Sequence, residues 1–111
     1  MGENISIQEF GRLDLRVGRI TEVTDHPSAD KLYVMQCDLG PELGTRQMVA
    51  GLKPYMPPDA LKDTLVVVVA NLEPATLRGE RSEAMLLAAQ DGDKVVVLTV
   101  AEPVAPGSKI L

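Results

Sequence analysis

The sequence predicts an all-β fold, a small barrel of short strands. Three observations support this prediction. Short runs of Val and Leu recur along the chain, glycine, proline and Asp-Gly signals separate these runs, and one short helical segment interrupts them. Of the 111 residues, 45% are hydrophobic and only 3% are aromatic, so we expect an aliphatic core. No repeat or Gly/Ser linker divides the chain, and residues 1–111 are therefore expected to form one domain.

A capping box predicts a short helix near the N-terminus. Ser6 and Glu9 have the S-x-x-E spacing in which each side chain caps the backbone N–H of the other residue. We expect this helix to end near Gly11, and we assign residues 1–13 to an N-terminal helical extension.

The middle of the chain predicts four strands and one helix. The first strand is expected at 14–23, where Gly18 suggests a bend. A turn cluster at 26–30 leads to a strand at 32–39, and a loop with glycine and proline at 40–44 leads to a strand at 46–50. A short helix at 56–62 and a strand at 65–72 follow. The helix holds its prolines in the first turn, where proline is tolerated.

Two more strands and an extension complete the predicted fold. Segments 84–89 and 94–100 flank Asp91-Gly92, a strong hairpin signal, and residues 101–111 end in a short strand near 109–111. Three strands, a helix and two strands is the element order of the five-stranded OB-fold barrel. We therefore predict an OB barrel with a short helix between strands 3 and 4, a short N-terminal helix and a C-terminal β extension.

Two segments, 66–69 and 95–98, carry Val or Leu on both faces of the predicted strand. In a small antiparallel barrel one face of each strand is normally solvated, so something must cover the outer face of these two. Either the C-terminal extension folds over them or a second copy of the chain does. We favour a homodimer, because one short extension is a small cover for two strands.

Composition excludes several functional classes. No apolar stretch approaches the roughly 20 residues that a membrane-spanning helix needs. The N-terminus lacks the basic and then apolar layout of a secretion signal, so we expect a cytoplasmic protein. The net charge of −5 argues against non-specific nucleic-acid binding.

The single histidine and the single cysteine predict neither catalysis nor metal binding. His26 lies in a turn with no nucleophile or second metal ligand beside it, so we expect a structural role. Cys37 lies in mid-strand among apolar residues and is expected to be buried and unreactive. We therefore expect neither residue to serve catalysis or to hold a metal or cofactor.

Six blocks of the sequence, in this order, resemble the tRNA-binding domain family. They are DLRVGRI (14–20), DHPSADKLYVMQCDLG (25–40), GL (51–52), VVVVANLEP (66–74), LRGERSEAMLLAA (77–89) and PVAPGSKI (103–110). This family includes the C-terminal domain of bacterial methionyl-tRNA synthetases, endothelial-monocyte-activating-polypeptide-like domains and free-standing dimeric tRNA-binding proteins. The chain is most similar to the free-standing type. The resemblance implies an OB barrel that binds the outer corner of folded tRNA without catalysis, as a homodimer or as an aminoacyl-tRNA synthetase accessory.

The resemblance also implies which residues contact RNA. Family members read N-L-x-P, a basic pair, R-G and S-[EQ]-G-M in the segment that corresponds to 71–85. The expected RNA-binding residues are Arg16, Lys31, Asn71, Arg78, Arg81, Ser82 and Met85. An arginine fork suits phosphate, a serine hydroxyl suits phosphate or ribose, and a methionine suits an exposed base. Three alternatives stay open: Asn71 holds a loop, Met85 is part of the core, and Tyr33 either stacks on a base or packs.

The chain also departs from the family pattern. Ala75-Thr76 stand in place of the basic pair, Glu73 where lysine is frequent and Ala84 in place of glycine, and segment 71–85 has two arginines against three glutamates. Each missing cation weakens attraction to phosphate, so we expect weak and salt-sensitive RNA binding. A second interpretation therefore stays open: a CsaA-like dimeric chaperone or protein-interaction module on the same fold, with an exposed apolar groove.

Overall fold

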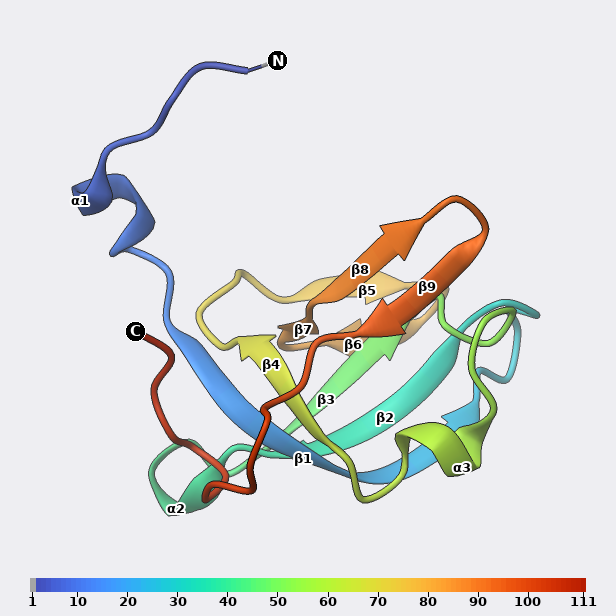
Figure 1. The fold of residues 1–111 in the computed structure, drawn as a ribbon. Helices are drawn as coiled ribbons and strands as arrows, with labels where there is room; N and C mark the ends of the chain where they lie inside the picture. The colour runs from blue at the N-terminus through green and yellow to red at the C-terminus, as the bar shows by residue number, and fades with distance from the viewer. Residues whose placement is uncertain (1) are drawn as a thin grey trace.

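Five antiparallel strands curl into a nearly closed barrel (Figure 1). The computed structural model describes residues 2–111. In the sheet order β3-β2-β1-β4-β7, the strands are β3 Thr45–Ala50, β2 Tyr33–Asp38, β1 Leu15–Asp25, β4 Leu65–Val69 and β7 Met85–Leu86. Two hairpins accompany them, formed by β5 Ala75–Leu77 with β6 Glu80–Ser82 and by β8 Ala88–Asp91 with β9 Lys94–Val97. The short helices are α1 Ile7–Phe10, α2 Gly40–Leu43 and α3 Pro58–Leu61. The predicted all-β barrel with a helix between strands 3 and 4 is confirmed.

The long strand β1 changes partner along its length. Its first part pairs with β4 and its second part with β2, and the β1–β2 register shifts at a bulge between Ile20 and Glu22. The predicted irregularity at Gly18 is therefore displaced by a few residues. Gly18 is needed for another reason, because a Cβ atom there would overlap the Sγ atom of Cys37 on β2.

The barrel interior is aliphatic and fully buried. Its centre comprises Ile20, Met35, Cys37, Leu39, Met48, Leu61, Val66 and Val68. Burial raises the pKa of the Cys37 thiol to about 12, so the thiol stays neutral and unreactive, as predicted. Leu61 comes from α3, which places this helix as a cap over one end of the barrel.

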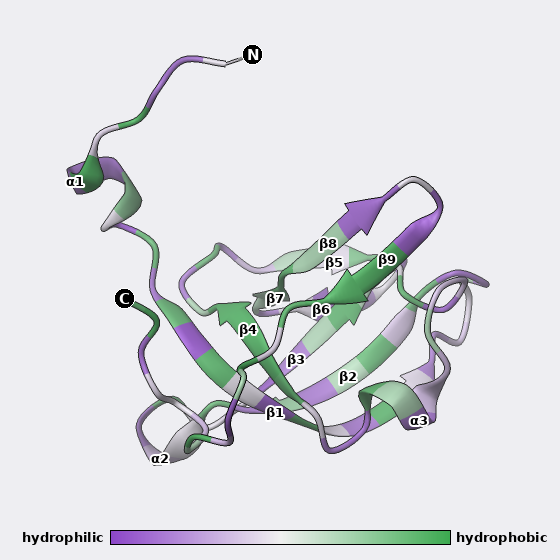
Figure 2. Ribbon diagram, in the orientation of Figure 1, coloured by the Kyte–Doolittle hydropathy of each residue, from purple (hydrophilic) through white to green (hydrophobic). Residues whose placement is uncertain are grey.

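The two valine-rich segments differ in how well the single chain covers them. Figure 2 shows hydrophobic residues along β4 and most of β9. In β4, Val66–Val69 are all buried within the single chain. β1 pairs along one edge of this strand, and the stem of the β8–β9 hairpin bonds to Val67 on the other. In contrast, Val96 and Leu98 remain 44% and 36% exposed. The expectation that β4 needs a second copy for cover is therefore wrong, and only the later segment keeps an open apolar face.

The C-terminal extension continues the sheet beside β1. The Val17 N–H donates to Ser108 O (2.8 Å), and the N–H groups of Gly107 and Ile110 donate to Val17 O (2.7 Å) and Leu15 O (2.9 Å). The extension thus occupies the edge of β1 that β2 takes over further along the strand. The predicted terminal strand near 109–111 is reduced to an isolated bridge between Arg16 and Lys109.

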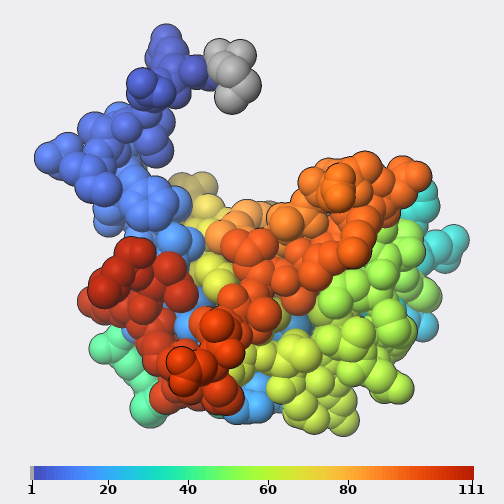
Figure 3. Space-filling model, viewed as in Figure 1, coloured from blue at the N-terminus to red at the C-terminus, as the bar shows by residue number. Residues whose placement is uncertain are grey.

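The N-terminal arm, residues 2–13, contains the predicted short helix. The capping box of Ser6 and Glu9 is present, with N–H···O distances of 3.0 and 3.1 Å, and Gly11 caps the end of α1. None of the residues of α1 is buried, and α1 stands clear of the barrel (Figures 1 and 3).

Candidate nucleic-acid interface

Two loops from distant parts of the sequence are bonded to one another at one end of the barrel. The loop after β1 carries His26 and Ser28, and the turn of the β5–β6 hairpin carries Leu77 and Arg78. The His26 Nε2–H donates to Leu77 O (2.9 Å), the Ser28 hydroxyl donates to Arg78 O (3.2 Å), and Arg78 Nη2 donates to Ser28 O (2.8 Å). Three hydrogen bonds therefore fix the relative positions of the two loops.

His26 is the centre of this contact. Its ring is buried, with 5% exposure, and Nδ1 accepts the Ser28 N–H at 3.0 Å. Because Nδ1 accepts, the ring proton lies on Nε2, where it meets the Leu77 carbonyl. Both nitrogens are thus used in holding the loops, which gives His26 a structural role.

The backbone of the β5–β6 turn is held in a conformation that favours glycine. Both central residues have positive φ, +53° at Arg78 and +94° at Gly79, as type I′ hairpin turns require. A non-glycine residue costs about 1–2 kcal/mol in this region. The Ser28 hydrogen bonds offset that cost by tying both the backbone and the guanidinium of Arg78 to the neighbouring loop.

Arg78 keeps its positive charge uncompensated. Its side chain is exposed and bonds only to the neutral Ser28 carbonyl, and within residues 2–111 no carboxylate lies within ion-pair distance of it. Lys31, at the end of the same β1–β2 loop, is also exposed and outside the ion pairs of the described chain. The structure therefore brings these two predicted cations onto adjoining loops.

The other predicted residues of the hairpin already make contacts within the chain. Arg81 on β6 is exposed, but its Nε lies 3.7 Å from the Glu83 carboxylate. The Ser82 hydroxyl accepts the Val49 N–H and donates to Ala84 O, both at 3.1 Å, and so joins β3 to the end of the hairpin. Ala84 is buried, so the departure from glycine at this position is accommodated.

Arg16 lies at the opposite end of β1 and is neutralised. It is 8% exposed, its Nε lies 2.6 Å from Asp14, and its Nη1 lies 3.1 Å from both Glu42 and Gly107 O. Hydrogen bonding to Asp14 raises the pKa of Arg16 above its usual value. The guanidinium thus ties β1, α2 and the C-terminal extension together, and the structure does not bring it to Lys31 and Arg78.

The structure shows the surroundings of the three residues for which the sequence left two roles open. The Asn71 amide accepts the Asp14 N–H (2.8 Å) and donates to Arg12 O (2.7 Å), so it holds the N-terminal arm against the end of β4. Met85 is 48% exposed, so it is not part of the core. Tyr33 is 2% exposed and its hydroxyl donates to Met56 O (2.8 Å), which leaves no face for stacking on a base.

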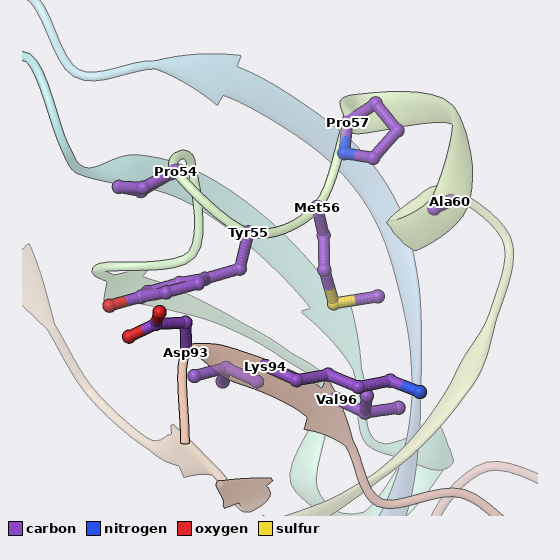
Figure 4. A pocket seen from close by; sticks show the side chains of 9 residues that line it. Pro54, Tyr55, Met56, Pro57, Ala60, Asp93, Lys94 and Val96 are labelled. Atoms are coloured by element: carbon purple, nitrogen blue, oxygen red, sulfur yellow. The ribbon is translucent and has the colours of Figure 1, made fainter. Parts of the chain in front are cut away.

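Sequence reasoning did not locate two apolar surfaces. Beside Met85, the exposed Leu72 and Leu77 border a hollow of about 150 Å³. A larger groove of about 570 Å³ lies between residues 54–60 and β9 (Figure 4). No periodic signal marks either surface. The hollow is lined mostly by the irregular segment 72–85, and the groove joins two segments, 54–60 and 93–96, that are distant in the chain.

Two other features, a metal site and a membrane-spanning helix, are absent from the described residues. Residues 2–111 contain no group of three or more His, Cys, Asp or Glu side chains placed to hold a metal ion. Within the same residues, no helix is long and apolar enough to cross a membrane.

Comparison with known sequences identifies close relatives. A family model described as "Putative tRNA binding domain" matches residues 15–109. Methionine–tRNA ligase of Pyrococcus furiosus is 54% identical over 106 residues, which cover 96% of this chain and 14% of that protein. The ligase of Thermotoga maritima is 43% identical over 106 residues, which cover 96% of this chain and 16% of that protein. The chain thus spans only about a seventh of the length of such relatives.

Two solved structures match almost the whole chain. A MetRS-related protein from Pyrococcus horikoshii has a TM-score of 0.91 with 28% identity, covering 99% of this chain and 100% of that one. A CsaA chaperone protein from Picrophilus torridus has a TM-score of 0.90 with 32% identity, covering 97% and 100%.

Proposed function

The chain belongs to the tRNA-binding domain family, and from that premise we propose that it binds folded tRNA at its outer corner without catalysing a reaction. The observation that carries this proposal is the exposed Arg78, held on two docked loops without a counter-charge. In OB folds the loops after strands 1 and 4 are the usual ligand-binding loops, and the docked pair occupies these positions.

The proposed contacts divide by chemistry. Arg78 and Lys31 bind phosphates, and Arg81 adds a weaker attraction because Glu83 lies beside it. Met85, with Leu72 and Leu77, offers an apolar surface to an unstacked base. Asn71 and Ser82 act by holding this surface in place, and Arg16 is left out of the contact set because its charge is neutralised.

We expect the electrostatic attraction between the proposed interface and tRNA to be weak. The chain has a net charge of −5, and Glu73, Glu80 and Glu83 lie on the segment that carries Arg78. Phosphate contacts release counterions, and each contact adds to the affinity at low salt and to its loss as salt rises, so an interface with few free cations starts from a low affinity that salt lowers further. We expect measurable binding to whole tRNA at low salt and little at physiological salt.

A salt titration of tRNA binding tests the proposal with a matched pair of variants. Arg78→Ala should weaken binding about tenfold and lower the salt slope by about 1, because one phosphate contact is lost. Arg19→Ala is the control, since Arg19 also donates to a neutral carbonyl, Asp63 O at 3.3 Å, but outside the docked loops. Absence of binding by the unaltered protein at low salt, or equal losses for the two variants, would contradict the proposal.

We further propose that the protein is a homodimer joined through the N-terminal arm. Ile5, Ile7, Phe10 and Leu13 are 64%, 74%, 41% and 43% exposed, although a capping box fixes the helix that carries two of them. Burial between two copies would remove this apolar surface from water. Ile7→Glu should convert the dimer to a monomer in sedimentation velocity, whereas Gln8→Glu, on the same exposed helix, should not.

A role beside an aminoacyl-tRNA synthetase, in the cytoplasm, is the remaining part of the proposal. It is supported by the identity to methionine–tRNA ligases, in which the matching segment is about a seventh of the chain. Affinity purification from the native cell should recover a synthetase that persists after ribonuclease treatment. If ribonuclease treatment releases the synthetase, the proposed partnership is wrong and the proposal of tRNA binding stands.

The apolar groove beside β9 favours a second candidate function, binding of unfolded protein segments. Its lining is mostly apolar, and the similar solved structures include a chaperone. Suppression of the aggregation of a chemically denatured client protein tests this function. No suppression at a stoichiometric excess of the protein would remove the candidate.

A further inference from the structure

The strand β9 has one unpaired edge. Its only strand partner within residues 2–111 is β8. The Leu98 N–H donates to Leu87 O, and bonded and non-bonded pairs alternate in an antiparallel ladder. Lys94 and Val96 therefore direct their main-chain groups toward β8, whereas the N–H and C=O of Val95 and Val97 point away from it, with no hydrogen-bond partner recorded in the described chain.

A groove follows this open edge. Residues 54–60 form its opposite wall, and Val95 and Val96 of β9 form the near wall. Figure 4 shows the Met56 side chain directed toward β9 and the Tyr55 ring at the mouth of the groove. Tyr55 is 47% exposed, so its ring is available to a bound molecule. The volume of about 570 Å³ accommodates several residues of a peptide.

The edge and its charges select the occupant. Main-chain donors and acceptors that repeat along an open strand are matched by an extended polypeptide backbone, which adds as a further strand. Asp93 and Lys94 both line the groove, and neither takes part in the ion pairs of residues 2–111. Figure 4 shows Asp93 beside Tyr55 at the groove mouth, whereas the Lys94 side chain extends away from Asp93, below Met56, so the two charges lie at different ends of the groove. Asp93 and the net charge of −5 favour a basic segment and disfavour a second copy of this acidic chain.

We propose that the open edge of β9 and the adjoining groove bind an extended peptide segment of another protein, with an apolar side chain between Tyr55 and Met56 and a basic side chain at Asp93. Binding would form main-chain hydrogen bonds at Val95 and Val97. This inference rests on the second candidate function, to which it adds the binding site and the class of segment, and it is independent of tRNA binding.

Amide-resolved NMR tests the proposal with a capped hexapeptide, Lys-Thr-Leu-Thr-Lys-Thr. Its leucine and both lysines lie on one face when it is extended. We expect the amide signals of Val95 and Val97 to shift and their hydrogen exchange to slow about tenfold at saturation, since each gains a hydrogen bond. The Val96 amide, already directed at β8, is the internal control and should not change its exchange rate.

Two altered peptides and two protein variants sharpen the result. A peptide with its central threonine replaced by proline should bind about tenfold more weakly, because proline cannot donate to the ladder. A peptide with glutamate in place of both lysines should also bind more weakly, and Asp93→Lys should reverse that preference. Tyr55→Ala should weaken peptide binding without changing tRNA affinity.

Three outcomes would overturn the proposal. Peptide at millimolar concentration that leaves Val95 and Val97 unchanged shows that the edge is no docking site. Slow exchange at these amides in the free protein that quickens on dilution assigns the edge to a second copy. Protection by tRNA but not by peptide assigns the groove to RNA. If client aggregation is still suppressed in any of these cases, protein binding stands and only its site here is wrong.

Discussion

Arg16 and Arg78 share one chemistry and have opposite surroundings. Arg16, near the start of β1, is 8% exposed and contacts the Asp14 and Glu42 carboxylates. Arg78, on the hairpin that docks beyond the other end of β1, is exposed and contacts only a backbone carbonyl. Both stand in blocks that resemble the same family, yet one belongs to the framework and the other to the candidate interface.

The difference shows that the number of cations in a motif does not measure its attraction for phosphate. A cation removed from water needs nearby counter-charges, and these cancel its field outside the protein. An exposed cation held by a neutral carbonyl keeps its field. The region around Arg16 therefore secures the C-terminal extension, and the region around Arg78 is the one able to recruit an anion.

The prediction with the largest expected effect compares two glycines with nearly the same backbone conformation. Gly107, beside Arg16, has φ +92°, and Gly79, beside Arg78, has φ +94°. A Cβ atom at Gly107 would lie 2.6 Å from Leu39 O, whereas nothing lies within 4 Å of one at Gly79. In urea unfolding, Gly107→Ala should lower the free energy of unfolding by about 3 kcal/mol or more and Gly79→Ala by about 1 kcal/mol. Equal losses would mean that the extension yields easily and does not secure the fold.

The next test separates the two arginines directly. Arg16→Gln removes the charge that joins Asp14, Glu42 and the extension, so the thermal midpoint should fall by several degrees. At a temperature where the variant is folded, its tRNA affinity and salt slope should match those of the parent. A reduced salt slope for Arg16→Gln would show that Arg16 reaches phosphate and that the assigned division is wrong.

Strands with clear turn signals could be predicted from the sequence, and elements held by distant contacts could not. The segments predicted at 32–39 and 46–50 match β2 and β3 to within a residue or so. The β5–β6 hairpin escaped prediction, because its residues are exposed or half-buried and show no apolar alternation. The stretch predicted as one strand at 84–89 is divided into β7 and β8 at Leu87, whose N–H turns to Val67 O.

The candidate site shows the same limit. The resemblance drew attention to Arg78, but its docking on Ser28 joins residues 50 positions apart. One half of the neutralisation of Arg16 could be predicted from the sequence, since Asp14 lies two residues earlier, on the same face of an extended chain. The other half, Glu42 and Gly107 O, depends on how α2 and the extension pack. Sequence therefore finds a charge more readily than it finds the charge that cancels it.

A smaller test concerns the contact that positions Arg78. His26→Ala removes the bonds to Leu77 O and from the Ser28 N–H, and should lower stability by about 1–2 kcal/mol. Because the docked loops loosen, tRNA affinity should fall severalfold with an unchanged salt slope. Ser28→Ala is the graded control, since it removes only the hydroxyl bond to Arg78 O, and its effects should be smaller. Larger effects from Ser28→Ala would assign the positioning role to the serine.

The smallest expected effect runs in the opposite direction, toward tighter RNA binding. Glu83→Gln removes the carboxylate 3.7 Å from Arg81 while an amide oxygen can still accept the Gln47 N–H, so stability should change little. With Arg81 no longer partly cancelled, affinity for tRNA at low salt should rise about two- to fourfold. Glu102→Gln changes the net charge equally but lies in the C-terminal extension, and it serves as the control. An equal gain from both variants would mean that the overall charge of −5, and not the local pairing of Arg81, limits the attraction for phosphate.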